Sequence, residues 1–130
     1  MGQQQLLLIV LGVIIVGIAV VVGINVFTAS SVQANSDALV ADCTNLAAMA
    51  QQYYRKPTAL GGGGNKFAGW TVPASLQRTA NMGADVTAVV EDELVTLTAT
   101  GTESGPSGTP ITVTMKVAPS KIDTTIITTD

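Results

Sequence analysis

Residues 6–24 read LLLIVLGVIIVGIAVVVGI, an uncharged apolar run interrupted only by Gly12, Gly17 and Gly23. An α-helix rises about 1.5 Å per residue, so this run would be roughly 28 Å long as a helix, close to the hydrocarbon thickness of a bilayer. Its many β-branched residues would favour a strand in a soluble protein. An isolated strand in lipid, however, leaves its backbone groups unpaired. The run therefore predicts a helix that is compatible with a membrane.

The helical pattern continues beyond this run as far as Tyr54. Here apolar residues recur at three- and four-residue steps among polar ones, with one gap at Ser36, and so form a stripe along one face of the helix. The stripe consists of Val32, Leu39, Cys43, Leu46, Ala50 and Tyr53. Arg55 and Lys56 stand where cations favour the end of a helix, and Pro57 follows. We expect one long helix, apolar over residues 1–28 and amphipathic to about residue 56.

Residues 57–65 include four consecutive glycines and predict a flexible linker. A short strand or extended segment is expected at 66–72 and a helical turn at 73–80. Alternating apolar and threonine residues then predict strands, joined by a tight turn at Glu91-Asp92 and a longer loop at 101–110; the strands are 85–90, 93–100, 111–117 and 122–128.

Such strands form an antiparallel sheet with one apolar face, which needs a cover. A small domain with a single cysteine and no disulfide has little core of its own, so the apolar stripe of the helix is the expected cover. The sequence predicts an α+β fold: a long N-terminal helix packed on a small antiparallel sheet, divided into an apolar half-helix (1–28) and a head (29–130, with the sheet region at 66–130).

Composition argues against several functional classes. The 130 residues carry a net charge of -3, which disfavours binding to nucleic acid. They include no histidine, the commonest general base and metal ligand. We predict no catalytic residue, no metal and no cofactor, and hence no enzyme. Glu91-Asp92-Glu93 is interpreted as a solvated turn rather than a calcium site, because it lacks further oxygen ligands at loop spacing.

A cleaved secretory signal is an alternative interpretation of the apolar run. Such signals have a basic start and a shorter apolar core of about 7–15 residues. Here the start, Met-Gly-Gln-Gln-Gln, is uncharged and the core is longer, which favours a permanent anchor. Small residues at Ala29-Ser30-Ser31 keep the alternative open.

This pattern resembles the type IV pilin and pseudopilin superfamily, over the architecture of the whole chain and most strongly over residues 1–54. The resemblance implies removal of a leader after a glycine, N-methylation of the new first residue, and a glutamate at mature position five that neutralises a neighbour's terminal amine. That position is Gln5 if Met1 is the mature terminus, or Leu7 if cleavage follows Gly2. We prefer Gln5, which is the last polar residue before the run. Neither residue is a glutamate, and a glutamine can accept a hydrogen bond without neutralising a charge.

The function implied by the resemblance is a pilin, the structural subunit of an extracellular type IV pilus-like filament. Its implied partners are identical subunits, the cytoplasmic membrane before assembly, a prepilin peptidase, an assembly ATPase and a platform protein. We expect the glycine-containing stretch 12–23 to lose helical structure in the filament. The expected assembly residues are Met1, Gln5, Leu6, Leu7, Gly12, Gly17 and Gly23, and the expected head-packing residues are Val32, Leu39, Cys43, Leu46 and Tyr53.

Two alternatives stay open from the sequence. One is a monomeric, single-pass membrane-anchored binding domain that uses loop 101–110 for recognition. The other is a minor pseudopilin of a secretion system, which would share the fold but form only short fibres.

Overall fold

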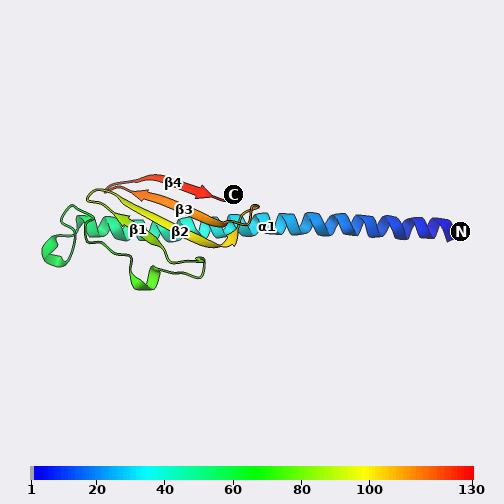
Figure 1. The fold of residues 1–130 in the computed structure, drawn as a ribbon, viewed down its shortest axis with the longest axis horizontal. Coiled ribbons are helices and arrows are strands. Elements are labelled where there is room, and N and C mark those ends of the chain that lie inside the picture. The colour runs from blue at the N-terminus through cyan, green and yellow to red at the C-terminus, as the bar shows by residue number, and fades with distance from the viewer. Residues whose placement is uncertain (1) are drawn as a thin grey trace. The chain divides into compact units, whose positions relative to one another are not determined.

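The computed structural model describes residues 2–130, which form one long helix and four strands (Figure 1). In chain order the elements are α1 (Gly2–Arg55), the 3-10 helices η1 (Thr58–Leu60) and η2 (Ala74–Leu76), and the strands β1 (Thr87–Val90), β2 (Val95–Ser104), β3 (Pro110–Val117) and β4 (Ile122–Thr128). The chain divides into two compact units, residues 1–31 and 32–130. The expected long helix is confirmed, and α1 runs through both units.

The C-terminal end of α1 is capped by the segment that follows it. The last carbonyls of a helix have no partner within the helix, and here the amides of Gly63 and Asn65 bond the carbonyls of Tyr53 and Tyr54, each at 2.8 Å. A Cβ on Gly63 would collide with the carbonyl of Lys66. Residues 57–65, which the glycine run predicted as a flexible linker, thus fold back as a cap on the end of α1, and Gly62, Gly63 and Gly64 allow close packing there.

The four strands form an antiparallel meander in the order β1-β2-β3-β4. Side chains alternate between the two faces of a strand, and every second residue of β2 and β3 is buried, from Val95 to Ala99 and from Ile111 to Val117. The intervening residues are mostly threonines on the outer face. The predicted sheet with one apolar and one wetted face is confirmed.

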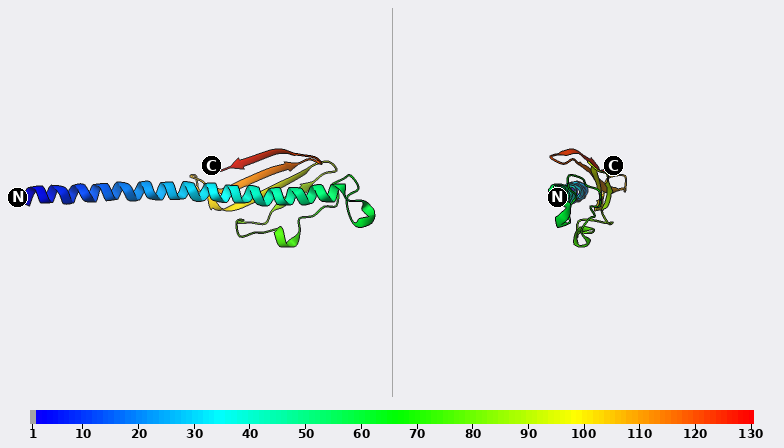
Figure 2. Two further views of the ribbon diagram at one scale, coloured as in Figure 1. Left: turned by 180° about the vertical axis from the view of Figure 1, so that it is seen from behind. Right: turned by 90° about the vertical axis from the view of Figure 1, so that its left-hand side faces the viewer.

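The core of residues 32–130 lies between this inner face and the second half of α1 (Figure 2). Leu39, Cys43 and Leu46 of the helix are fully covered there, together with Phe67 from the segment before the sheet. The ring of Phe67 packs at 4.9 Å, centroid to centroid, on that of Tyr54. The α+β architecture expected from the sequence is therefore the observed one.

Several expected boundaries were wrong. Residues 66–72 form no strand, because the chain turns at Ala68-Gly69, and Phe67, Trp70 and Val72 are buried without period-two alternation. The expected helical turn at 73–80 is confirmed by η2. The connection between β1 and β2 extends from Glu91 to Leu94, two residues beyond the predicted tight turn.

The loop expected at 101–110 is also shorter than predicted. β2 continues to Ser104 and β3 begins at Pro110, so only residues 105–109 connect them. The extension includes Gly101, which is buried against α1 and forms a bridge to Met82. A glycine at this place is required for close approach, whereas the sequence pattern indicated a turn.

Candidate assembly surface

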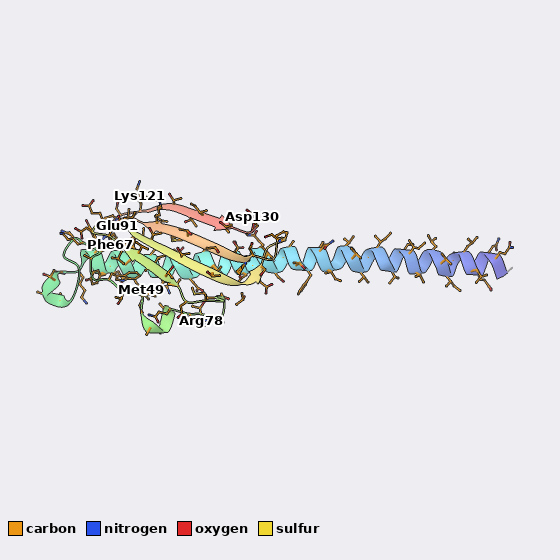
Figure 3. The ribbon with its side chains drawn as sticks, in the orientation of Figure 1. Met49, Phe67, Arg78, Glu91, Lys121 and Asp130 are labelled. Atoms are coloured by element: carbon orange, nitrogen blue, oxygen red, sulfur yellow. The ribbon has the colours of Figure 1, made fainter. Side chains whose placement is uncertain are left out.

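The apolar residues from Leu6 to Ile24 cover every side of the first half of α1. The fifteen large apolar side chains in this stretch are 53–69% exposed, and Figure 3 shows side chains projecting above and below this part of the helix. None of them is covered within its own compact unit. α1 is long and apolar enough to cross a membrane.

The free energy gained by covering these side chains is large compared with the stability of a small domain. Covering a fully exposed large aliphatic side chain stabilises by about 1.5–3 kcal/mol. Because a little over half of each of these fifteen side chains is exposed, together they represent on the order of 10–30 kcal/mol. Folded domains are stable by only about 5–15 kcal/mol. The segment is therefore compatible with membrane anchoring, in which lipid would cover these side chains.

Gly12, Gly17 and Gly23 have no structural requirement inside the chain. A Cβ added at any of the three would have no atom within 4 Å, although each glycine costs the helix about 1 kcal/mol relative to alanine. At about 100° per residue, Gly12 and Gly23 lie on nearly the same side of the helix, about 20° apart, whereas Gly17 lies about 140° from Gly12. Close approach at these glycines would thus admit neighbours on two sides of the helix rather than a single partner.

The helix is continuous through these glycines in the single chain. The unwinding expected at 12–23 is therefore not a property of the isolated subunit, because the i to i−4 backbone bonds of the helix tolerate glycine when nothing competes for them. Unwinding in a filament stays a prediction.

The other expected assembly residues lie at the start of α1. Gln5, Leu6 and Leu7 are exposed, and Met1 lies outside the described residues. Gln5 ends the polar start of the helix, directly before the apolar run. Its exposed amide can accept a hydrogen bond from another chain.

The expected head-packing residues are found on one stripe of α1. Leu39, Cys43 and Leu46 are buried, while Val32 and Tyr53 are half-buried and pack against the core. The Tyr53 hydroxyl donates to the carbonyl of Ala68 at 3.0 Å. Burial, with a smaller effect of the Asp42 carboxylate, raises the pKa of the Cys43 thiol to about 11, so this cysteine is an unreactive packing residue.

Sequence reasoning missed the polar residues that complete this stripe. Asn35 is buried: its amide nitrogen donates to the carbonyl of Asn81 at 2.9 Å, and its amide oxygen accepts from the backbone N–H of Glu103 at 3.3 Å. Asp42 accepts from the Thr79 hydroxyl at 2.7 Å. The gap in the stripe at Ser36, which is itself buried, was the only signal in the sequence.

Glu91-Asp92-Glu93 lies in the exposed connection between β1 and β2. The amide of Glu91 bonds the carbonyl of Leu94 at 2.8 Å, and Lys66 pairs with Asp92 at 3.3 Å. Across residues 2–130, no group of three or more acidic, histidine or cysteine side chains is arranged to hold a metal ion.

No protein-family model matches this chain, and neither a curated protein nor a solved structure matches it.

Proposed function

We propose that this chain is the structural subunit of an extracellular filament of the type IV pilus kind, built by packing of the N-terminal halves of α1. One observation supports it above all others: fifteen large apolar side chains from Leu6 to Ile24 are exposed on every side of one continuous helix. A helix that served only to anchor the head in a membrane would need sufficient length and apolar side chains, but no glycines. The three glycines with open space around them add a reason for close helix contacts.

The filament forms by exchanging one apolar environment for another. In the membrane, lipid covers the segment at little cost. In water the exposed surface would carry a penalty of roughly 25 cal/mol per Å², so the segment leaves the bilayer only where identical segments cover it at once. Head-to-tail packing of identical chains by a screw operation gives an open polymer.

The start of the helix contributes polarity rather than charge to this assembly. Gln5 accepts a hydrogen bond from the terminal amine of a neighbour but does not neutralise it. The apolar contacts of the segment consequently supply most of the affinity between subunits.

The partners follow from the resemblance to type IV pilins. A prepilin peptidase sets the terminus, and an assembly ATPase with a platform protein drives extraction from the cytoplasmic membrane. The subunit itself is no enzyme in this proposal, and it contributes neither metal nor cofactor.

Electron microscopy of material sheared from cells that express the full chain tests the proposal, with mass spectrometry of the same fraction. Long filaments composed mainly of this chain are expected, with the terminus defined by the intact mass. Detergent-dependent monomers, with no polymer at any level of expression, would overturn the proposal in favour of a membrane-anchored binding domain. Short fibres that appear only on overproduction would overturn it in favour of a minor pseudopilin.

A further inference from the structure

Both edges of the sheet offer unpaired backbone groups. Within residues 2–130, the backbone groups of β1 and β4 form no hydrogen bond except those to β2 and β3, respectively. Natural sheets protect such edges with lysine, proline or bulges. β1 (TAVV) contains no charge and no proline. In β4 the one charge, Asp123, and the irregular register beside it lie at the start of the strand, and residues 124–128 (TTIIT) contain neither a charge nor a proline. Edges of this kind are open to pairing with another strand.

β4 also carries apolar side chains that nothing covers. Ile127 lies opposite Val113 in the antiparallel register and therefore shares its face of the sheet. Val113 is fully buried, whereas Ile127 is 44% exposed. All seven residues of β4 are exposed, so this strand extends beyond the cover that α1 gives to the inner face.

The topology determines how two copies can meet at these edges. An antiparallel sheet of four strands has edge strands that run in opposite directions. When two copies stand side by side with the same polarity, β4 of one is therefore antiparallel to β1 of the next. Subunits related by one screw axis have this common polarity.

Charge at one end of the sheet agrees with this pairing. Val90, Val117 and Ile122 lie in one row across the sheet, through Val95 of β2. The next residue after β1 is Glu91 and the residue before β4 is Lys121, and Figure 3 shows both at the same end of the sheet. Lys121 of one copy would consequently oppose Glu91 of its neighbour. The pair that Lys121 forms with Asp123 is exposed and exchanges at little cost.

From this geometry we infer that the heads of neighbouring copies join edge to edge, with β4 of one copy pairing antiparallel with β1 of the next. The inference rests on the proposed filament, since it takes the common polarity of the subunits from it. The partner is a second copy of this chain, and the sheet continues from head to head. β4 is three residues longer than β1 (seven against four), so in the register that sets Lys121 opposite Glu91 the last residues of β4 extend beyond β1 of the neighbour.

Cysteine cross-linking in the full chain tests this contact. Val89 and Thr124 are exposed and stand at the two ends of one row across the outer face, through Thr96 and Lys116. In the double variant V89C/T124C, a short bismaleimide added to sheared material should join successive copies into a ladder of covalent oligomers. The native Cys43 is buried and does not compete. Neither single variant should give a ladder, nor should V89C/Q52C, which places the second thiol on an exposed helix position.

A charge exchange at the same contact provides a second test. In the V89C/T124C background, K121E should lower the cross-linked fraction by about 2- to 5-fold, the range expected for an exposed pair. The further change E91K should restore it. A cross-linked fraction that stays the same in both variants would overturn the contact between Lys121 and Glu91 and the register that places them together.

Microscopy of each sample separates this inference from the proposed function. Filaments with a ladder support both. Filaments without a ladder, or with a ladder equally strong in V89C/Q52C, overturn the edge pairing and leave the filament intact. A ladder without filaments supports the pairing and overturns the proposed function, and the absence of both overturns both.

Discussion

Replacing Gly101 by alanine should destabilise the head through one buried contact. Gly101 lies in β2 where this strand passes close to α1, and a Cβ there would collide with the side-chain oxygen of Asn35 and approach Leu39 Cδ1 to 3.1 Å. Asn35 would have to move, giving up its hydrogen bonds to Asn81 and Glu103.

The size of the effect follows from those contacts. Each hydrogen bond contributes about 0.5–1.5 kcal/mol net, and overpacking a core costs about 1–3 kcal/mol. We expect G101A to lower the free energy of unfolding by roughly 2–6 kcal/mol, the sum of these contributions. In an N35A background the main collision is absent, so the same substitution should cost at least about 1 kcal/mol less, a coupling typical of residues in contact.

Urea unfolding of the full chain in detergent, followed by tryptophan fluorescence, measures these differences. Trp70 is the single tryptophan and is 7% exposed, so its emission reports the folded head. T100A, one residue earlier on the outer face of the same strand, is the matched control and should change stability by less than about 1 kcal/mol. Equal costs of G101A in the two backgrounds, or no cost in either, would refute the reasoning.

Three further predictions concern α1. G17L should leave head unfolding unchanged, since a Cβ at this position has open space around it, but should reduce the yield of sheared filaments relative to an I18L control; equal yields would contradict the role of the glycines. L39A removes a fully buried side chain and should lower the free energy of unfolding by about 2–5 kcal/mol, measured by Trp70 fluorescence, and a loss below about 1 kcal/mol would contradict the packing. In the folded chain the Cys43 thiol keeps its proton up to a raised pKa of about 11, whereas in the unfolded chain it loses the proton near its ordinary pKa of 9.0. The free energy of unfolding should therefore fall as pH rises from 9 to 11, by roughly 2–3 kcal/mol more than in C43A. Parallel curves of unfolding free energy against pH for the two proteins would contradict this prediction.

The helix and the sheet could be predicted from the sequence because local patterns determine them. A long uncharged run, a stripe at helical spacing and two strands in which apolar residues alternate mainly with threonine each carry a strong local signal. Arg55, Lys56 and Pro57 indicated the end of α1 to within a residue. The apolar half of α1 was predicted as a helix compatible with a membrane for the same reason.

The remainder depends on contacts between distant residues. Asn35 looks like a surface residue in sequence, yet its partners lie 46 and 68 residues away. Gly101 reads as the start of a loop, yet it allows β2 to pass close to the helix. The glycines at 61–64 read as a flexible linker, yet several allow close packing at the end of α1. A glycine in the sequence can indicate either a close approach of the backbone to another segment or a flexible segment, and the sequence alone does not distinguish these two roles.

A helical reconstruction of sheared filaments by cryo-electron microscopy tests the central claim most directly. We predict a core made of the segments from Leu6 to Ile24 of many copies, packed against one another and shielded from solvent. A filament core built from other residues, or a chain that yields only single copies with this segment in detergent, would contradict the claim.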